Sequence, residues 1–425
     1  MNVETPREGA PDLSTLTRVF LRIGLLSFGG PAAQIALMHR ELVELRAWLT
    51  ERQFLSALSF CMLLPGPEAM QLAAFSGWRL RGLSGGLIAG LLFIAPGAVV
   101  IAVLASLYVS FGQVPLVQAA FLGIKATVVI VVLQALIKVM GRALTSPWAY
   151  GLAGAAFLAL FAFDLPFPLV IFVAAIIGAL AMTSEPAEPV DAPEVNLANT
   201  LRTAFIWGAI WLVPLGLIWA LDPSGLLAQL GAFFAKLAVV TFGGAYAVLA
   251  YMVQQVVGEF GWLTTPQMID ALGLAETTPG PLILVTEFVA FLAGAQEGGI
   301  ALGVAAALLS LWVTFVPCFL WIFVAAPYVD WIGAQPRLTG ALSGITAAVV
   351  GVILNLSLWF ALNTAFAEVA RNGWGLWLPD PGSLNPLALG LMGVAAALLL
   401  WRKLDLLLVL AVMGGLGALT SFIPL

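Results

Sequence analysis

Three glutamates lie within otherwise apolar stretches of the sequence, each close to an interruption rich in proline and glycine. Glu68 directly follows Pro65-Gly66-Pro67, Glu276 shortly precedes Pro279-Gly280-Pro281, and Glu287 follows that second interruption. A carboxylate at membrane depth costs at least ~2.5 kcal/mol on insertion scales, and desolvation favours its protonated form. We therefore interpret all three as candidates for proton coupling or gating. Pairing with a buried base, or a place in an aqueous vestibule, would also explain them.

Glycine and proline interrupt the apolar pattern at four places, and these interruptions indicate broken helices. Proline fits just inside a helix start, and glycine allows tight turns and the close approach of a ligand to the backbone. Each half-helix start presents free N–H donors and roughly +0.5 of a charge, so four converging starts supply roughly +2, which suits a dianion. Kinks that serve only helix packing are the alternative. The predicted anion-binding backbone comprises Gly29, Gly30, Gly66, Gly243, Gly244 and Gly280.

Polar side chains beside these interruptions are candidate donors to the oxygens of an anion. They are Ser27, Gln34, Gln71, Thr241, Tyr246, Thr277 and Thr278. Hydrogen bonding between helices, worth about 0.6 kcal/mol on average, is their simpler role. Lys125 is a cation inside an apolar segment, a candidate for coupling or gating. It either neutralises the anion, pairs with a buried glutamate or extends to the membrane surface.

The composition places the chain in a membrane. Of its 425 residues, 62% are hydrophobic and only 9% are charged, and the mean hydropathy is +1.06; soluble domains carry about 25% charged residues. This excludes an ordinary soluble enzyme and a nucleic-acid-binding protein, because no basic surface is available for phosphates. With one histidine and two cysteines, both in apolar stretches, no metal site, disulfide or cofactor is expected.

The sequence contains an internal duplication. Phe28-Gly29-Gly30 recurs in the second half as Phe242-Gly243-Gly244, and the same offset relates Pro65-Gly66-Pro67 to Pro279-Gly280-Pro281. Farther along, a slightly larger offset relates Pro96 to Pro317 and Gly123 to Gly344. Because each register holds across Gly and Pro, we infer two repeats, at about 16–183 and 229–423, each with about six hydrophobic segments.

The connection between the repeats predicts their relative orientation. A polar tail (1–15) precedes the first repeat, and an acidic, proline-rich linker (184–201) and one extra helix (202–221) separate the two. Six segments plus one is an odd number, so the second repeat is expected to be inverted, as in many secondary transporters. The predicted fold is an all-α polytopic membrane protein, and two segments of each repeat either cross fully or re-enter at their breaks.

Basic residues in loops indicate the orientation in the membrane. The loop after the first segment carries Arg40, Arg46 and Arg52, whereas its counterpart in the second repeat carries Glu259 and no Lys or Arg. With re-entrant segments, the positive-inside rule predicts a cytoplasmic N-terminus and a periplasmic C-terminus.

The interruptions and their neighbours resemble the signature of the chromate ion transporter (CHR) superfamily. In the first half the resemblance lies in Phe28-Gly29-Gly30-Pro31, Gln34, Trp48, Pro65-Gly66-Pro67-Glu68 and Gln71. In the second half it lies in 241–246 and 274–283, so the chain is similar to the long-chain members with two homologous halves. The resemblance implies chromate efflux across the bacterial inner membrane and chromate resistance, with sulfate as the close chemical mimic. The second repeat has Ala245 where the first has Pro31, which departs from equivalence at those turns.

The predicted function is therefore transport of a tetrahedral dianion by alternating access. With the cell interior negative, an exiting dianion gains roughly 4.6 kcal/mol per 100 mV, so export requires no ATP site, and the sequence has no phosphate-binding loop motif. Sulfate, molybdate or another oxyanion, moved in either direction, is the alternative. An intramembrane enzyme or a structural membrane protein is a further alternative, but no catalytic dyad supports an enzyme. The partners expected are chromate or sulfate and the lipid bilayer, with no nucleic acid; the coupling ion and a homodimer stay open.

Overall fold

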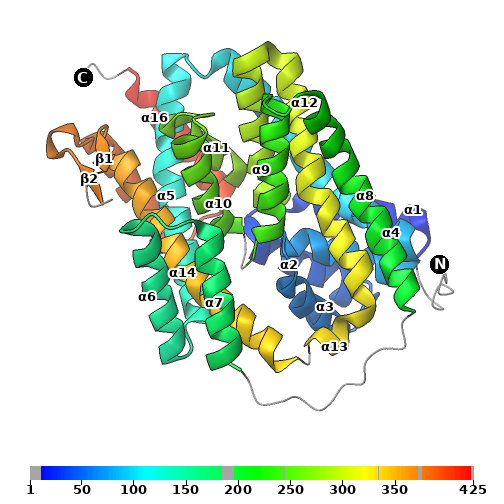
Figure 1. Cartoon of the computed structure of the whole chain (residues 1–425). Helices are drawn as coiled ribbons and strands as arrows, with labels where there is room; N and C mark the ends of the chain where they lie inside the picture. The colour runs from blue at the N-terminus through cyan, green and yellow to red at the C-terminus, as the bar shows by residue number, and fades with distance from the viewer. Residues whose placement is uncertain (1–10, 184–195, 243–244, 334, 372–375, 423–425) are drawn as a thin grey trace. The chain divides into compact units, whose positions relative to one another are not determined.

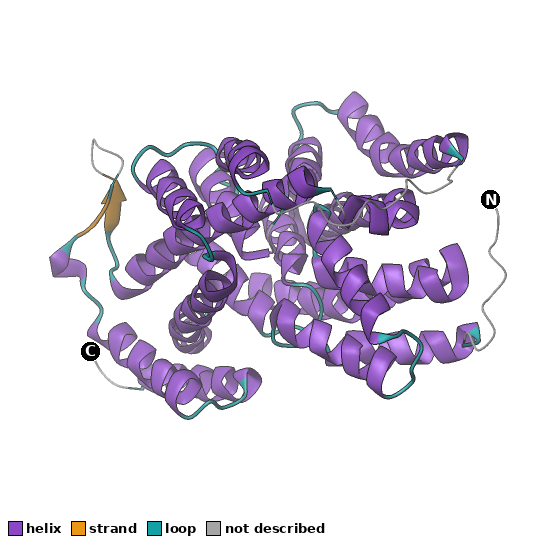
Figure 2. Cartoon of the chain, turned by 90° about the horizontal axis from the view of Figure 1, so that it is seen from below, coloured by secondary structure: helices purple, strands orange, loops and turns teal. Residues whose placement is uncertain are grey.

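The computed structural model describes residues 11–183, 196–242, 245–333, 335–371 and 376–422. These residues are almost entirely helical, and the strands among them form one short antiparallel pair (Figure 2). Strand β1 (Val369–Arg371) pairs with β2 (Trp377–Pro379). The predicted all-α class is confirmed. Gly243, Gly244 and most of the predicted tail and linker lie outside the described residues.

Several helices have the length and apolar composition needed to cross a bilayer, which confirms the prediction of a multi-pass membrane protein. Within the described part of the chain, the five long stretches are α4 (Glu68–Phe111), α5 (Pro115–Ala143), α8 (Leu197–Leu221), Leu282–Tyr328 including α12 (Val285–Ala325), and α14 (Pro336–Ala365). Shorter apolar helices are α6 (Pro147–Phe161), α7 (Phe167–Ala181), α9 (Leu226–Val240), α15 (Pro386–Ala396) and α16 (Leu406–Thr420). Helix α8 begins at Leu197 rather than at 202, because the side chain of Asn196 caps its first turn.

The two longest helices each contain a sharp reversal. The backbone leaves the helical conformation at Arg81-Gly82 in α4 and at Gly298-Gly299 in α12, with φ of +61° at Gly82 and +75° at Gly299. A Cβ added to Gly77 would lie 2.2 Å from the carbonyl oxygen of Gly85, so the two parts of α4 fold back on each other. A Cβ added to Gly294 would likewise lie 2.7 Å from the carbonyl oxygen of Leu302, so both α4 and α12 are tight helical hairpins.

The helices of the first repeat stop and restart at the predicted interruptions. Helix α1 (Leu13–Leu26) ends before Ser27, and α2 (Gly30–His39) begins with Pro31 in its first turn. A π-helical turn η1 (Arg40–Glu44) follows α2. Helix α3 (Glu51–Leu63) ends before Pro65-Gly66-Pro67, and α4 begins directly afterwards. Gly29, Gly30 and Gly66 have φ of +84°, +77° and +124°, values that side chains disfavour.

The second repeat stops and restarts in the same way. Helix α9 ends at Val240, and α10 (Ala245–Val253) and the π-helical turn η2 (Gln254–Glu259) follow. Helix α11 (Thr265–Glu276) ends before Pro279-Gly280-Pro281, and a 3-10 turn η3 (Leu282–Leu284) leads into α12. Thr50 and Thr264, which are equivalent under the duplication, start α3 and α11 with the same capping box. The remaining short elements are η4 (Ala326–Tyr328), α13 (Val329–Gly333), η5 (Pro381–Ser383) and η6 (Ala397–Trp401).

The chain forms two compact units that do not coincide with the two sequence repeats. The first unit draws on 1–105, 185–245 and 278–339, and the second on 106–184, 246–277 and 340–425. Each unit therefore combines segments of both repeats. Contacts between the repeats are consequently found inside each unit.

The first unit is built around α12, which packs along α9 and α8 (Figure 1). Trp207 of α8 lies against Phe319 and Phe323 of α12, with ring centroids 5.9 and 5.1 Å away. Phe319 and Phe323 are buried, and aromatic groups of this size contribute much of the packing energy of a helix pair.

The second unit is built around α5, which packs against α16, α15 and α11. Glycines allow the helices to touch backbone to backbone: a Cβ at Gly123 would lie 1.8 Å from the Met413 oxygen. A Cβ at Gly344, the equivalent of Gly123 in the second repeat, would lie 2.3 Å from the Ala174 oxygen. The two repeats thus use equivalent glycines for close helix packing, as is common in membranes.

We expect Gly123→Leu and Gly344→Leu to destabilise the protein, each by about 1–3 kcal/mol or more, because a backbone oxygen cannot move aside as a side chain can. Gly154→Leu, in α6, is the matched control, because no atom lies within 4 Å of the added Cβ position. The measurement is the thermal unfolding midpoint of each purified variant in detergent. Equal midpoints for all three variants would contradict the packing role.

Candidate functional site

Two backbone hydrogen bonds join the broken segments of the two repeats in the first unit. The N–H of Gly66 donates to the carbonyl oxygen of Thr241 at 2.8 Å, and the N–H of Gly280 donates to the carbonyl oxygen of Ser27 at 2.8 Å. The offset that relates Gly66 to Gly280 also relates Ser27 to Thr241, so the two bonds are equivalent under the duplication. Each Pro-Gly-Pro interruption is therefore bonded to the first interruption of the other repeat.

A second pair of equivalent residues braces the same interruptions. A Cβ at Gly97 would lie 2.2 Å from the Pro279 oxygen, so the α4 backbone touches the second Pro-Gly-Pro turn directly. Cys318 of α12, the equivalent of Gly97 at the larger offset, places its Sγ atom 3.0 Å from the Cβ position of Gly66. These contacts leave no room for a larger side chain at Gly97 or Gly66.

Two fully buried glutamines hold the turns from inside. Gln34 donates its amide hydrogens to the carbonyl oxygens of Gly280, at 2.7 Å, and Ser27, at 3.3 Å. Gln71 donates to the carbonyl oxygen of Pro65 at 2.7 Å. The Oε1 atom of each glutamine is buried without a hydrogen-bond partner among the described residues. Gln34 thus uses both hydrogens of its amide group, so its predicted role as a donor to an anion would require it to give up one of these partners.

The hydroxyl groups predicted to line the site bond within their own segments. Ser27 donates to the Ile23 oxygen at 2.6 Å, and Thr241 donates to the Leu237 oxygen at 2.5 Å. Ser27 and Thr241 are buried, and so is Thr278. The hydroxyl groups of Ser27 and Thr241 therefore bond to carbonyl oxygens of the helix that precedes each interruption.

Tyr246, Thr277 and Glu276 belong to the second unit, unlike the predicted site residues at the interruptions of the first unit. The Tyr246 hydroxyl donates to Glu276 Oε1 at 2.9 Å, and Thr277 donates to the Leu274 oxygen at 2.7 Å. The tyrosine thus provides the hydrogen bond that a buried carboxyl group needs.

The three glutamates singled out by the sequence differ in burial. Glu276 and Glu287 are buried, with 6% and 2% of their surface exposed, and Glu68 is half-buried. Within the described part of the chain none of them forms an ion pair, and Oε2 of Glu287 has no hydrogen-bond partner.

Lys125 does not pair with a glutamate; its partner is Asp270, a residue that the sequence analysis did not identify. The Nζ atom lies 3.0 Å from Asp270 Oδ1, and the Tyr108 hydroxyl donates to Oδ2 at 2.8 Å. All three residues belong to the second unit, and Asp270 is 6% exposed. The available signal was an aspartate inside the apolar segment that starts at Gln267.

Comparisons with known proteins identify the family of the chain. The sequence model described as "Chromate transporter" matches residues 14–179 and 228–418. The chain belongs to the chromate transporter family. It is 30% identical over 347 residues to the "Probable chromate transport protein" of Synechococcus elongatus, covering 81% of this chain and 83% of that protein.

Two other relatives match this chain over a similar share of their length. The "Chromate transport protein" of Cupriavidus metallidurans is 32% identical over 344 residues, covering 80% of each chain. That of Pseudomonas aeruginosa is 32% identical over 337 residues, covering 79% of this chain and 77% of its own. No solved structure matches the chain. The two stretches matched by the family model contain one partner each of both crossed hydrogen bonds.

We expect the loss of either Lys125 or Asp270 alone to destabilise the protein more than the loss of both. Asp270→Leu or Lys125→Met alone leaves one buried charge without its partner, which costs about 3–5 kcal/mol, whereas replacing both partners by apolar residues costs far less. The check is a double-mutant cycle of thermal unfolding midpoints for Lys125→Met, Asp270→Leu and the double variant.

Lys138→Met is the control, because Lys138 is an exposed lysine on the same helix α5. Additive effects of the two single substitutions would show that the two charges do not stabilise each other.

Proposed function

We propose that this protein transports chromate, a tetrahedral dianion, outward across the bacterial inner membrane by alternating access and so confers chromate resistance. The single observation that supports this most is the pair of crossed bonds between the Pro-Gly-Pro turns and the Ser27 and Thr241 carbonyl groups. Chromate is proposed as the substrate because the names of two relatives state chromate transport.

The crossed bonds supply donors that an oxyanion can use. The N–H groups of Gly66 and Gly280 sit where α4 and the η3–α12 segment begin, and helix starts favour negative charge. A charged oxygen accepts a hydrogen bond roughly twice as strongly as a neutral carbonyl does. A bound dianion would therefore replace the Thr241 and Ser27 carbonyl groups as the partner of these donors.

The equivalence of the two bonds suggests how access alternates. In this structure an equivalent hydrogen bond joins each Pro-Gly-Pro turn to the other repeat. Backbone bonding therefore stabilises the two interruptions to the same degree. Opening one bond on one side and the other bond on the opposite side would expose the anion to each aqueous phase in turn. Inverted repeats perform this exchange in many secondary transporters.

The membrane potential provides the driving force for export. An exiting dianion gains roughly 4.6 kcal/mol per 100 mV, a factor of more than a thousand in concentration. Glu68, Glu276 and Glu287 are the residues proposed to couple protons or to gate the path, since buried carboxyl groups bind protons readily. Sulfate has the same charge and shape, so the same donors would bind it.

The test is chromate uptake into everted membrane vesicles, in which outward transport becomes uptake. We expect uptake in energised vesicles that exceeds that of vesicles without the protein, and that falls when valinomycin and potassium collapse the potential. Nigericin, which removes the pH gradient, reports proton coupling. Excess sulfate competes if the two anions share the site. Chromate uptake equal to that of the empty vesicles would contradict the proposal.

The same assay tests the interruptions. We expect Gly66→Leu and Gly280→Leu to lower uptake about tenfold or more, because leucine disfavours the positive φ at both turns and so displaces the backbone N–H from the anion. The loss corresponds to one charge-assisted hydrogen bond of ~1.5–3 kcal/mol. Gly154→Leu, with no atom within 4 Å of its added Cβ position, should retain uptake. Expression and thermal unfolding of each variant show whether a loss reflects folding. Unchanged uptake in both interruption variants would mean that the anion does not use these turns.

A further inference from the structure

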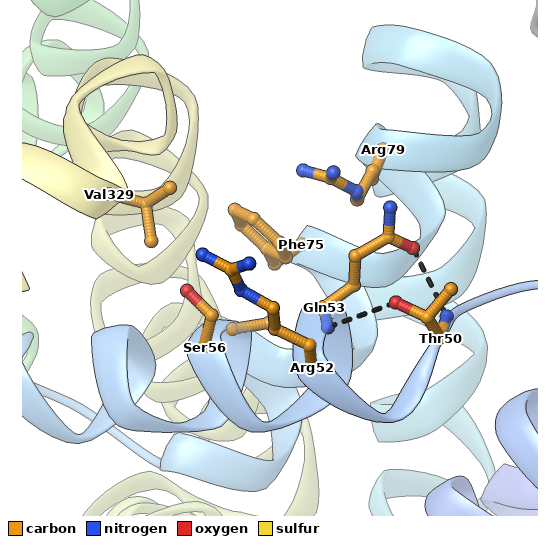
Figure 3. A pocket seen from close by; sticks show the side chains of 8 residues that line it. Thr50, Arg52, Gln53, Ser56, Phe75, Arg79 and Val329 are labelled. Carbon is orange, nitrogen blue, oxygen red and sulfur yellow. Dashed lines mark hydrogen bonds between the residues drawn. The ribbon is translucent and has the colours of Figure 1, made fainter.

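A pocket of about 340 Å³ in the first unit is lined by eight residues, two of which are arginines. It lies between α3, the first half of α4 and α13, and Figure 3 shows Arg52 and Arg79 extending beside the ring of Phe75. The hydroxyl group of Ser56 lies near the guanidinium group of Arg52 in the same view. The combination of two cations, a hydroxyl group and an aromatic wall is suited to an anion.

The pocket is connected by the fold to the Pro-Gly-Pro turn of the first repeat. Arg52 lies in the first turn of α3, whose other end reaches Pro65-Gly66-Pro67, and Arg79 lies just before the reversal at Arg81-Gly82. A helix of the 13 residues of α3 is about 20 Å long. The basic pocket and the interruption therefore mark opposite ends of the same pair of helices.

Side-chain charge, rather than the start of α3, makes this pocket attractive to anions. The N–H groups of Thr50 and Gln53 at the start of α3 are already occupied, because these two residues form a reciprocal capping box, drawn as dashed lines in Figure 3. Guanidinium groups offer planar pairs of donors that match oxyanion geometry. At ~30 Å³ per water, the pocket has room for an oxyanion that keeps part of its hydration shell.

The second repeat has no equivalent of this basic pocket in its sequence. Under the offset that relates the Pro-Gly-Pro turns, Arg52 corresponds to Pro266 and Ser56 corresponds to Asp270. The counterpart of Arg79 falls in 293–296, which reads Ala-Gly-Ala-Gln. The positive-inside rule concentrates arginines on one membrane face, and the fold brings two of them together around a single pocket there. The asymmetry fits a function at one membrane face.

We infer that the Arg52–Arg79 pocket is a capture site for hydrated tetrahedral oxyanions, which concentrates them at one face before they reach the interruption. This inference rests on the proposed transport function. A cleft lined by one sign of charge raises local counter-ion concentration and association rates by about 10- to 1,000-fold, and this effect falls with ionic strength. The site thus gives the carrier a preferred loading face.

Transport kinetics test the capture role. In everted vesicles at low ionic strength, Arg52→Gln/Arg79→Gln should raise the KM for chromate about tenfold, within the range for electrostatic focusing, with little change in maximal rate. Arg52→Lys/Arg79→Lys should keep most of the affinity, and added inert salt should weaken transport by wild type more than by the glutamine variant. Arg142→Gln, an exposed arginine on α5, is the control for loss of a positive charge elsewhere. An unchanged KM in the double glutamine variant would overturn the inference.

A second experiment does not depend on chromate flux. In Ser56→Cys protein, an anionic methanethiosulfonate reagent should modify the new thiol about tenfold faster than a cationic one, and Arg52→Gln/Arg79→Gln should remove this preference. Inorganic sulfate should slow the reaction by occupying the pocket. The native Cys61 and Cys318 are buried, so unsubstituted protein serves as the blank.

The two experiments separate the inference from the proposed function. Anionic preference and sulfate protection without any chromate uptake would sustain the pocket and reject chromate as the transported ion. Chromate uptake in wild-type vesicles, together with equal rates for the anionic and cationic reagents, would reject the pocket and leave the transport function standing.

Discussion

The structure of the first unit depends on two backbone hydrogen bonds that run in opposite directions between repeats. Backbone polar groups at membrane depth must be paired, and broken helices leave several without helical partners. The Gly66–Thr241 and Gly280–Ser27 bonds satisfy one such group from each interruption with another. The interruptions are therefore stable only together, because one repeat alone would carry unsatisfied donors and acceptors in lipid.

The surrounding side chains follow from this constraint. The Gly97 backbone and the Cys318 side chain approach the two turns closely. Gln34 and Gln71 donate hydrogen bonds to carbonyl groups of the turns. Close packing of small residues and satisfied amide groups are the usual means of stabilising irregular backbone inside a membrane protein. The interruptions thus form a preorganised backbone structure, in which the N–H donors bond to carbonyl groups of the protein.

Much of this architecture could be predicted from the sequence, because it depends on residue types with strict backbone consequences. Helices stop before Gly29, Gly66 and Gly280 because proline and left-handed glycine interrupt them, and Thr50 and Thr264 start helices because their capping boxes are local. The partners of buried groups could not be predicted, because they depend on which helices meet. Asp270 became the partner of Lys125 through the packing of α11 on α5, and the division into two units mixes segments that are distant in sequence.

The Lys125–Asp270 pair has a consequence for turnover. With its charge compensated by Asp270, Lys125 forms an ion pair rather than a lone cation. Under the proposed transport function, a lysine compensated in this way would retain a passing dianion less strongly than a lone cation. An anion bound by amide dipoles would experience partial charges distributed over several groups, each contributing modestly. Both effects would favour rapid release, on which a carrier that must empty after every cycle depends.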